Sequence, residues 1–148
     1  MKKTMRLVLL IALMGALVLS ACADGSPPAT KPAGPSWPAR LVTGRVTYLQ
    51  RIALPASAVV EVQLQDVSLA DAPATVISTQ TIETQGKQAP FPYRLPYDVT
   101  QIQANHTYSV RATIKDAGKL LFTSTQAYPV ITNGAPTHDV EILVEPMP

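Results

Sequence analysis

Apolar and polar residues alternate with a period of two through most of the chain after residue 41. This alternation is typical of half-buried β-strands. It occurs in residues 42–48, 59–65, 91–97, 108–114 and 139–145, and more weakly in residues 76–82 and 120–126. No segment after the N-terminal apolar run has the 3.6-residue period of an amphipathic helix. The sequence therefore predicts about seven short strands and an all-β domain.

Turn signals and prolines indicate how these strands are arranged. Asp116–Lys119 and Asn133–Pro136 combine Asp, Asn, Gly and Pro between apolar segments, as turns do. Pro92 and Pro96 cannot donate hydrogen bonds to a neighbouring strand, so the strand at 91–97 is expected at a sheet edge. About seven short antiparallel strands in one domain predict a single antiparallel β-sandwich of the immunoglobulin-like type.

Tyr108 stands at the start of a predicted strand, six residues after Ile102. This spacing is typical of a tyrosine corner, in which the hydroxyl bonds to nearby backbone. The alternative is an aromatic contact to a ligand. We expect the structural role.

Residues 1–21 have the charged-then-apolar order of a secretory signal peptide. The uncharged run from residue 7 to residue 19 is too short for a typical transmembrane helix, which needs about 20 apolar residues. Leu19-Ser20-Ala21-Cys22 is similar to the bacterial lipobox. We therefore expect cleavage before Cys22, diacylglycerol on its thiol and acylation (palmitate) of its new amino group, which anchors the protein to the lipid bilayer. The alternative is an ordinary signal-peptide cysteine that is lost on cleavage.

Residues 22–39 are expected to form a lipidated N-terminus and a proline-rich linker, ahead of a β-sandwich domain at 40–148. At about 3.1 Å per residue, a polyproline tether could hold the domain up to roughly 50 Å from the bilayer. Trp37 either docks on the domain edge or lies at the lipid interface. By resemblance to enteric lipoproteins, Ala23 directly after the cysteine favours the outer membrane, with the domain facing the periplasm.

The formal net charge of +2 arises from the signal peptide. Lys2, Lys3 and Arg6 are three of the 12 basic residues, so the chain from Cys22 onward has nine against ten acidic residues. A nearly neutral domain without a basic cluster excludes nucleic acid as a partner.

Several segments together resemble the YbaY/YscW lipoprotein family. They are Gly44–Pro55 (GRVTYLQRIALP), Val60–Ser68, Phe91–Asp98, Tyr108–Ile114, Leu120–Phe122 and Ala127–Val130. The resemblance spans about residues 42–144 and implies a β-sandwich lipoprotein with little chemistry. One branch of the family contains pilotins, small lipoproteins that help a secretin reach the outer membrane and assemble there. The other branch is widespread, largely of unknown role and sometimes linked to polysaccharide metabolism, and residues 51–55 are closer to it.

The residues that could perform catalysis or bind a metal are few. Cys22 is consumed by lipid, which leaves His106 and His138 as the imidazoles. A zinc site needs three or four ligands with a compatible spacing, and no such set is found. No Gly-x-Ser-x-Gly or Ser-x-x-Lys motif is present. We therefore predict no enzyme, no metal and no cofactor, and a hydrolase is the weakest alternative.

Four residues are candidates for binding. Arg51 follows the first strand, where its guanidinium could recognise a carboxylate or a sugar. The alternative is an arginine whose stem covers core while its head pairs with Asp66 or Asp98. Tyr93, Tyr97 and Tyr128 could form an aromatic platform for carbohydrate or peptide, or could pack in the core and at the edges.

These observations predict a non-catalytic envelope lipoprotein that binds or chaperones another envelope component, for example by adding a peptide strand to a free sheet edge. The alternatives are a glycan-binding module, a secretin pilotin and, last, a hydrolase.

Overall fold

The structure is a computed structural model that describes residues 38–148. The signal peptide, the lipobox with Cys22, the tether and Trp37 lie outside the described residues. The expectations about them therefore stay predictions.

The described chain consists of short strands and one turn of 3-10 helix. In chain order these are β1 (Ala39–Thr47), β2 (Ala58–Asp66), β3 (Thr75–Glu83), β4 (Phe91–Asp98), η1 (Val99–Gln101), β5 (Tyr108–Asp116), β6 (Lys119–Thr123), β7 (Tyr128–Val130), β8 (Val140–Leu143) and β9 (Glu145–Pro146). All seven predicted strands are present. No helix in residues 38–148 is long and apolar enough to cross a membrane.

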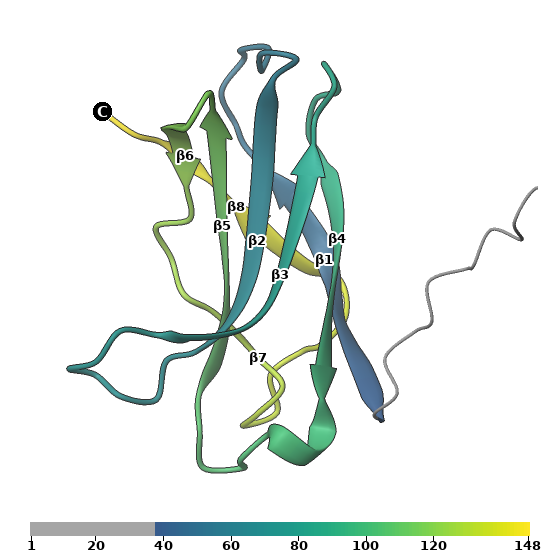
Figure 1. Cartoon of the computed structure of the whole chain (residues 1–148), viewed down its shortest axis with the longest axis vertical. Helices are drawn as coiled ribbons and strands as arrows, with labels where there is room; N and C mark the ends of the chain where they lie inside the picture. The colour runs from purple at the N-terminus through teal and green to yellow at the C-terminus, as the bar shows by residue number, and fades with distance from the viewer. Residues whose placement is uncertain (1–37) are drawn as a thin grey trace, which may run out of the picture. The chain divides into compact units, whose positions relative to one another are not determined.

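The strands form two sheets (Figure 1). One sheet has the order β4-β1-β8. The other has the order β3-β2-β5-β6-β9, and β7 pairs with β5. The predicted all-β sandwich is confirmed, and so is the placement of β4 at an edge. One pairing differs from the expectation, because β1 and β8 run parallel. A period of two is the same in parallel and antiparallel strands, so the alternation alone does not give the direction of pairing.

The core lies between the two sheets and is built from the residues that the alternation places on one face. Those of β2, β4 and β5 are Val60, Val62, Leu64, Phe91, Tyr93, Leu95, Tyr97, Tyr108, Val110, Ala112 and Ile114, all at most 5% exposed. Val42 and Val46 of β1 and Ile142 of β8 lie in the same sheet as β4 and face β2 and β5 across the core. At about 25 cal/mol per Å² of buried apolar surface, this core is the main stabilising contribution.

Gly44 lies at the centre of the smaller sheet, between Tyr93 on β4 and Val140 on β8 in the strand register. The Tyr93 ring passes over this glycine, and its hydroxyl donates to the Val140 carbonyl at 3.0 Å. A Cβ at residue 44 would lie 1.9 Å from that carbonyl oxygen. Burial raises the pKa of Tyr93, so the hydroxyl keeps its proton and can donate. The glycine thus lets one side chain bridge all three strands.

Both edges of the smaller sheet carry features that hinder strand addition. Arg94 donates its backbone N–H, on the outer side of β4, to the Gln80 side chain. Since N–H groups alternate along a strand, Pro92 and Pro96 occupy the same side and donate nothing. At the β8 edge, the Tyr128 hydroxyl accepts from the Leu143 N–H at 2.8 Å and donates to the Leu143 carbonyl at 3.2 Å. An incoming peptide would find these backbone groups absent or occupied.

Candidate functional site

Three connections meet at one end of the sandwich. They are residues 67–74 between β2 and β3, residues 99–107 between β4 and β5, and residues 131–139 between β7 and β8. We call this the loop end. It is the lower end in Figure 1, where η1 follows β4 and the β2–β3 connection projects to the left.

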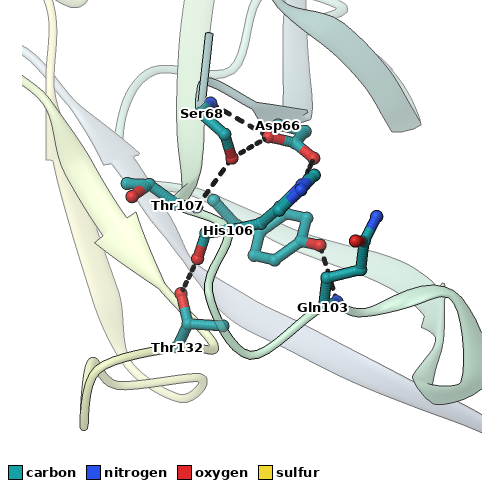
Figure 2. Close-up of polar contacts among 7 residues, drawn as sticks. Asp66, Ser68, Gln103, His106, Thr107 and Thr132 are labelled. Carbon is teal, nitrogen blue, oxygen red and sulfur yellow. Dashed lines mark hydrogen bonds and ion pairs between the residues drawn. The ribbon is translucent and has the colours of Figure 1, made fainter.

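Asp66, the last residue of β2, is the centre of a hydrogen-bond network at the loop end (Figure 2). One carboxylate oxygen accepts from both the backbone N–H and the hydroxyl of Ser68. The other lies 2.6 Å from His106 Nδ1. Ser68 Oγ also accepts from the Thr107 N–H at 2.9 Å. The network therefore ties the β2–β3 connection to the β4–β5 connection.

The charge state of Asp66 follows from these bonds. Partial burial acts to raise the pKa of Asp66, but the hydrogen bonds from Ser68 and His106 outweigh it and lower the pKa below 3.8. The carboxylate is thus ionised at neutral pH and can only accept. His106 Nδ1 therefore carries the proton that is donated.

This arrangement differs from a catalytic triad. In a triad the histidine lies between the carboxylate and the serine and takes the proton of the serine. Here Asp66 lies between Ser68 and His106, and the serine hydroxyl donates to the carboxylate. Within residues 38–148 neither His106 nor His138 bonds to a serine hydroxyl, which the hydrolase alternative would need. The network holds loops in place.

Two further bonds attach the rest of the loop end to this network. Thr132 donates its hydroxyl to the His106 carbonyl at 2.8 Å, which joins the β7–β8 connection (Figure 2). The Tyr108 hydroxyl accepts from the Gln103 N–H at 3.0 Å. Tyr108 is 1% exposed. The expected tyrosine corner, with its hydroxyl on nearby backbone, is confirmed.

A cleft of about 380 Å³ opens beside the network. It is lined by Arg40, Tyr97, Val99, Ile102, Ala104, Ile131, Thr132, Asn133 and Thr137. The volume falls within the range of small-ligand sites in proteins. The cleft lies where the strands end, so its walls come from β1, from the β4–β5 connection and from the β7–β8 connection.

Arg40 lines the cleft from β1. In β1 the core-facing residues alternate, with Val42 and Val46 fully buried and Gly44 between them. Arg40 has the same phase one step earlier, but it is exposed. A charged side chain cannot close the core as a valine would. The core-facing pattern of β1 therefore ends before Arg40, and the half-buried Val99, Ile102 and Ile131 line the cleft with it.

Ile131 lines the same cleft with an uncommon backbone. Its φ is 71°, and the Thr132 N–H donates to the Val130 carbonyl at 2.8 Å, which makes a γ-turn centred on Ile131. A β-branched residue with positive φ is a strained outlier. Such strain is concentrated at functional positions in proteins. At this position a γ-turn would favour Gly or Asn. The turn instead places the half-buried, apolar side chain of Ile131 at the cleft.

The sequence-predicted binding residues lie elsewhere or are buried. Arg51 is exposed in the β1–β2 connection, and within residues 38–148 it makes no ion pair. The predicted pairing with Asp66 or Asp98 is wrong. Asp66 bonds to Ser68 and His106, and hydrogen bonds from the side chain and N–H of Thr100 occupy Asp98 and lower its pKa.

The three tyrosines do not form an exposed platform. Tyr93 and Tyr97 are 1% and 5% exposed and point into the sandwich, so the packing alternative describes them. Tyr128 is half-buried and closes the β8 edge. Tyr97 also forms part of the cleft wall.

The remaining imidazole lies away from the network. His138 Nδ1 is 3.5 Å from the Thr43 hydroxyl on β1. In the part of the chain that the structure describes, no three His, Cys, Asp or Glu side chains come together as metal ligands.

Sequence reasoning missed the cleft. Its lining comes from three segments that are ordinary in sequence. The available signal was Arg40, which has the phase of the buried valines although it is charged.

Comparisons with known proteins agree with this fold. The family model described as type III secretion system lipoprotein chaperone (YscW) matches residues 37–142. The uncharacterized lipoprotein YbaY of Escherichia coli (strain K12) is 34% identical over 139 residues, which cover 86% of this chain and 73% of the relative.

A solved structure is also similar. It is an alternative pilotin from the type II secretion system of Vibrio cholerae, 49% identical, with a TM-score of 0.67. The similarity covers 72% of this chain and 97% of that chain.

Proposed function

The chain belongs to the YscW family of type III secretion system lipoprotein chaperones, and from this premise we propose that it is a non-catalytic envelope lipoprotein that holds a secretin subunit. Its task would be that of a pilotin, to keep the subunit from aggregating and to guide it to the membrane where it assembles.

One observation carries this proposal. The similar pilotin is 49% identical, and 97% of its chain is covered. Nearly the whole of that chain thus has a counterpart here. A surface that binds a partner in that fold can be present in this chain without any added domain.

The geometry supports binding over catalysis and over glycan recognition. The hydrogen-bond network of Asp66 immobilises loops and lacks the order of a catalytic triad. Glycan sites usually stack sugar on exposed aromatic rings, whereas Tyr93 and Tyr97 are buried. The cleft at the loop end offers a preformed place for a protein segment.

The anchor completes the proposal. Cleavage before Cys22 and lipidation of that residue would attach the domain to the outer membrane, as Ala23 favours, with the domain in the periplasm. More than one acyl chain gives stable anchoring. The proline-rich linker would let the domain reach a subunit at some distance from the lipid.

The test is co-purification of the full-length, tagged and lipidated protein with a secretin of the same bacterium from detergent-solubilised membranes. We expect the secretin to co-purify, and deletion of the gene to reduce heat-resistant secretin multimers in the outer membrane. Cys22→Ser is the matched control, since it should keep secretin binding but lose delivery. If the secretin neither co-purifies nor changes on deletion, the proposal is wrong.

A further inference from the structure

The cleft at the loop end combines an apolar wall with one charged group. Val99, Ile102 and Ile131 are half-buried and supply the apolar surface. Arg40 is the one charged residue of its lining. A planar guanidinium that is always charged is well suited to a carboxylate, which it can bind through two parallel hydrogen bonds.

Arg40 has no carboxylate of its own among the described residues. The ion pairs there join Arg45 to Glu141, His106 to Asp66 and Lys115 to Glu61. Asp98 pairs in register with the neighbouring Ala39, but its oxygens already accept from Thr100 and Gln101. The positive charge at the cleft is therefore available to a partner.

Polar groups beside Arg40 add capacity for a peptide backbone. Within residues 38–148 the side-chain amide of Asn133 and the hydroxyl of Thr137 form no hydrogen bond, whereas the Thr132 hydroxyl donates to the His106 carbonyl. An amide and a hydroxyl can both donate and accept, as a bound backbone requires.

We propose that this cleft binds a segment of the partner protein in which an acidic side chain adjoins an aliphatic one. Arg40 pairs with the carboxylate, and Ile102 and Ile131 cover the aliphatic group. The occupant follows from charge complementarity, since the lining of the cleft presents one cation and no anion. This inference rests on the proposed function and names the site for it.

Isoleucine methyl groups give a direct test, because Ile102 and Ile131 line the cleft while Ile52, Ile114 and Ile142 do not. The lipidated mature protein, methyl-labelled in phosphatidylcholine nanodiscs, is titrated with acetyl-Leu-Glu-Leu-amide and with acetyl-Leu-Gln-Leu-amide at millimolar concentration. We expect shifts at the Ile102 and Ile131 methyls. The Glu peptide should bind about fivefold more tightly than its Gln counterpart, the most that a solvent-accessible ion pair gives.

Two variants separate recognition from folding. Arg40→Gln should remove the difference between the peptides, while Arg45→Gln, on the outer face of the same strand, should preserve it. Asparagine tolerates the positive φ at residue 131 but lacks the apolar contact. The Ile131→Asn protein should therefore stay folded and bind both peptides more weakly.

The inference fails if neither cleft methyl shifts, if the two peptides bind equally, or if Arg40→Gln leaves the preference intact. Secretin co-purification is read separately. Retained co-purification in Arg40→Gln would refute this site but not the proposed function. A cleft that prefers the Glu peptide in a protein that captures no secretin would refute the function but not the site.

Discussion

Replacing Gly44 with alanine is expected to destabilise the domain strongly. The new Cβ would lie 1.9 Å from the Val140 carbonyl oxygen and 2.7 Å from the Tyr93 hydroxyl oxygen. The carbonyl belongs to the backbone of β8, so it cannot move without disturbing the parallel pairing with β1. Overpacking costs about 1–3 kcal/mol. Separating the buried hydroxyl from its carbonyl costs about 1–3 kcal/mol more. The free energy of unfolding should fall by about 2–6 kcal/mol, a large part of the stability of an ordinary domain.

The sign of this effect is informative. Glycine within a strand normally costs about 0.5–1 kcal/mol relative to alanine, so without the close approach Gly44→Ala would stabilise the protein. Urea unfolding of unlipidated protein, followed by circular dichroism, measures the difference. Tyr93→Phe alone should cost about 1–3 kcal/mol. In the Gly44→Ala background, Tyr93→Phe should lower the free energy of unfolding by about 1–2 kcal/mol less than it does in the wild type, because the hydroxyl is already displaced. A Gly44→Ala protein as stable as wild type, or fully additive costs, would refute the bridging role of Tyr93.

Three further predictions concern the loop end, a sheet edge and the anchor. Because the folded-state pKa of Asp66 is lowered, its contribution to stability is present above about pH 3.8 and is lost as the pH falls through the folded value. Asp66→Asn should therefore lower the free energy of unfolding by about 1–2 kcal/mol at pH 7, and the difference from the wild type should disappear in acid. Urea midpoints measured as a function of pH give this difference, and a difference that does not change with pH would contradict the prediction. Tyr128→Phe should speed hydrogen exchange of the Leu143 amide, measured by NMR, and unchanged protection would show that the hydroxyl does not hold this edge. Cys22→Ser should abolish radiolabelled palmitate incorporation; label retained in this variant would contradict lipidation at this residue.

The strands could be predicted because each buries one face. Val60, Val62 and Leu64 alternate with polar residues, and the structure buries all three. β7 and β9 could not be predicted, since three and two residues are too short for a period to show. The parallel pairing of β1 with β8 depends on how the 131–139 connection crosses between the sheets, and that path has no periodic signature.

The site was less predictable than the fold. Tyrosine and arginine suggest binding because they are common at interfaces. In this chain, however, the hydroxyls of Tyr93, Tyr108 and Tyr128 bond to backbone groups. Their tertiary partners are far apart in sequence, so no local pattern shows that the hydroxyls are already used. The γ-turn at Ile131 was equally hidden, because a β-branched residue predicts extended backbone.

These hydroxyl bonds bear directly on function. Tyr93 crosses the smaller sheet, Tyr108 fixes the β4–β5 connection and Tyr128 bonds to the Leu143 backbone at the β8 edge, so these three hydroxyls are not available to a partner. Under the proposed function, recognition is expected to use the side chains at the loop end. At the loop end the core-facing pattern of β1 ends in Arg40, and the strained turn places Ile131 beside it. If the cleft binds the partner as proposed, a difference at residue 40 or 131 should change the partner. Specificity within this fold should accordingly be sought in the cleft.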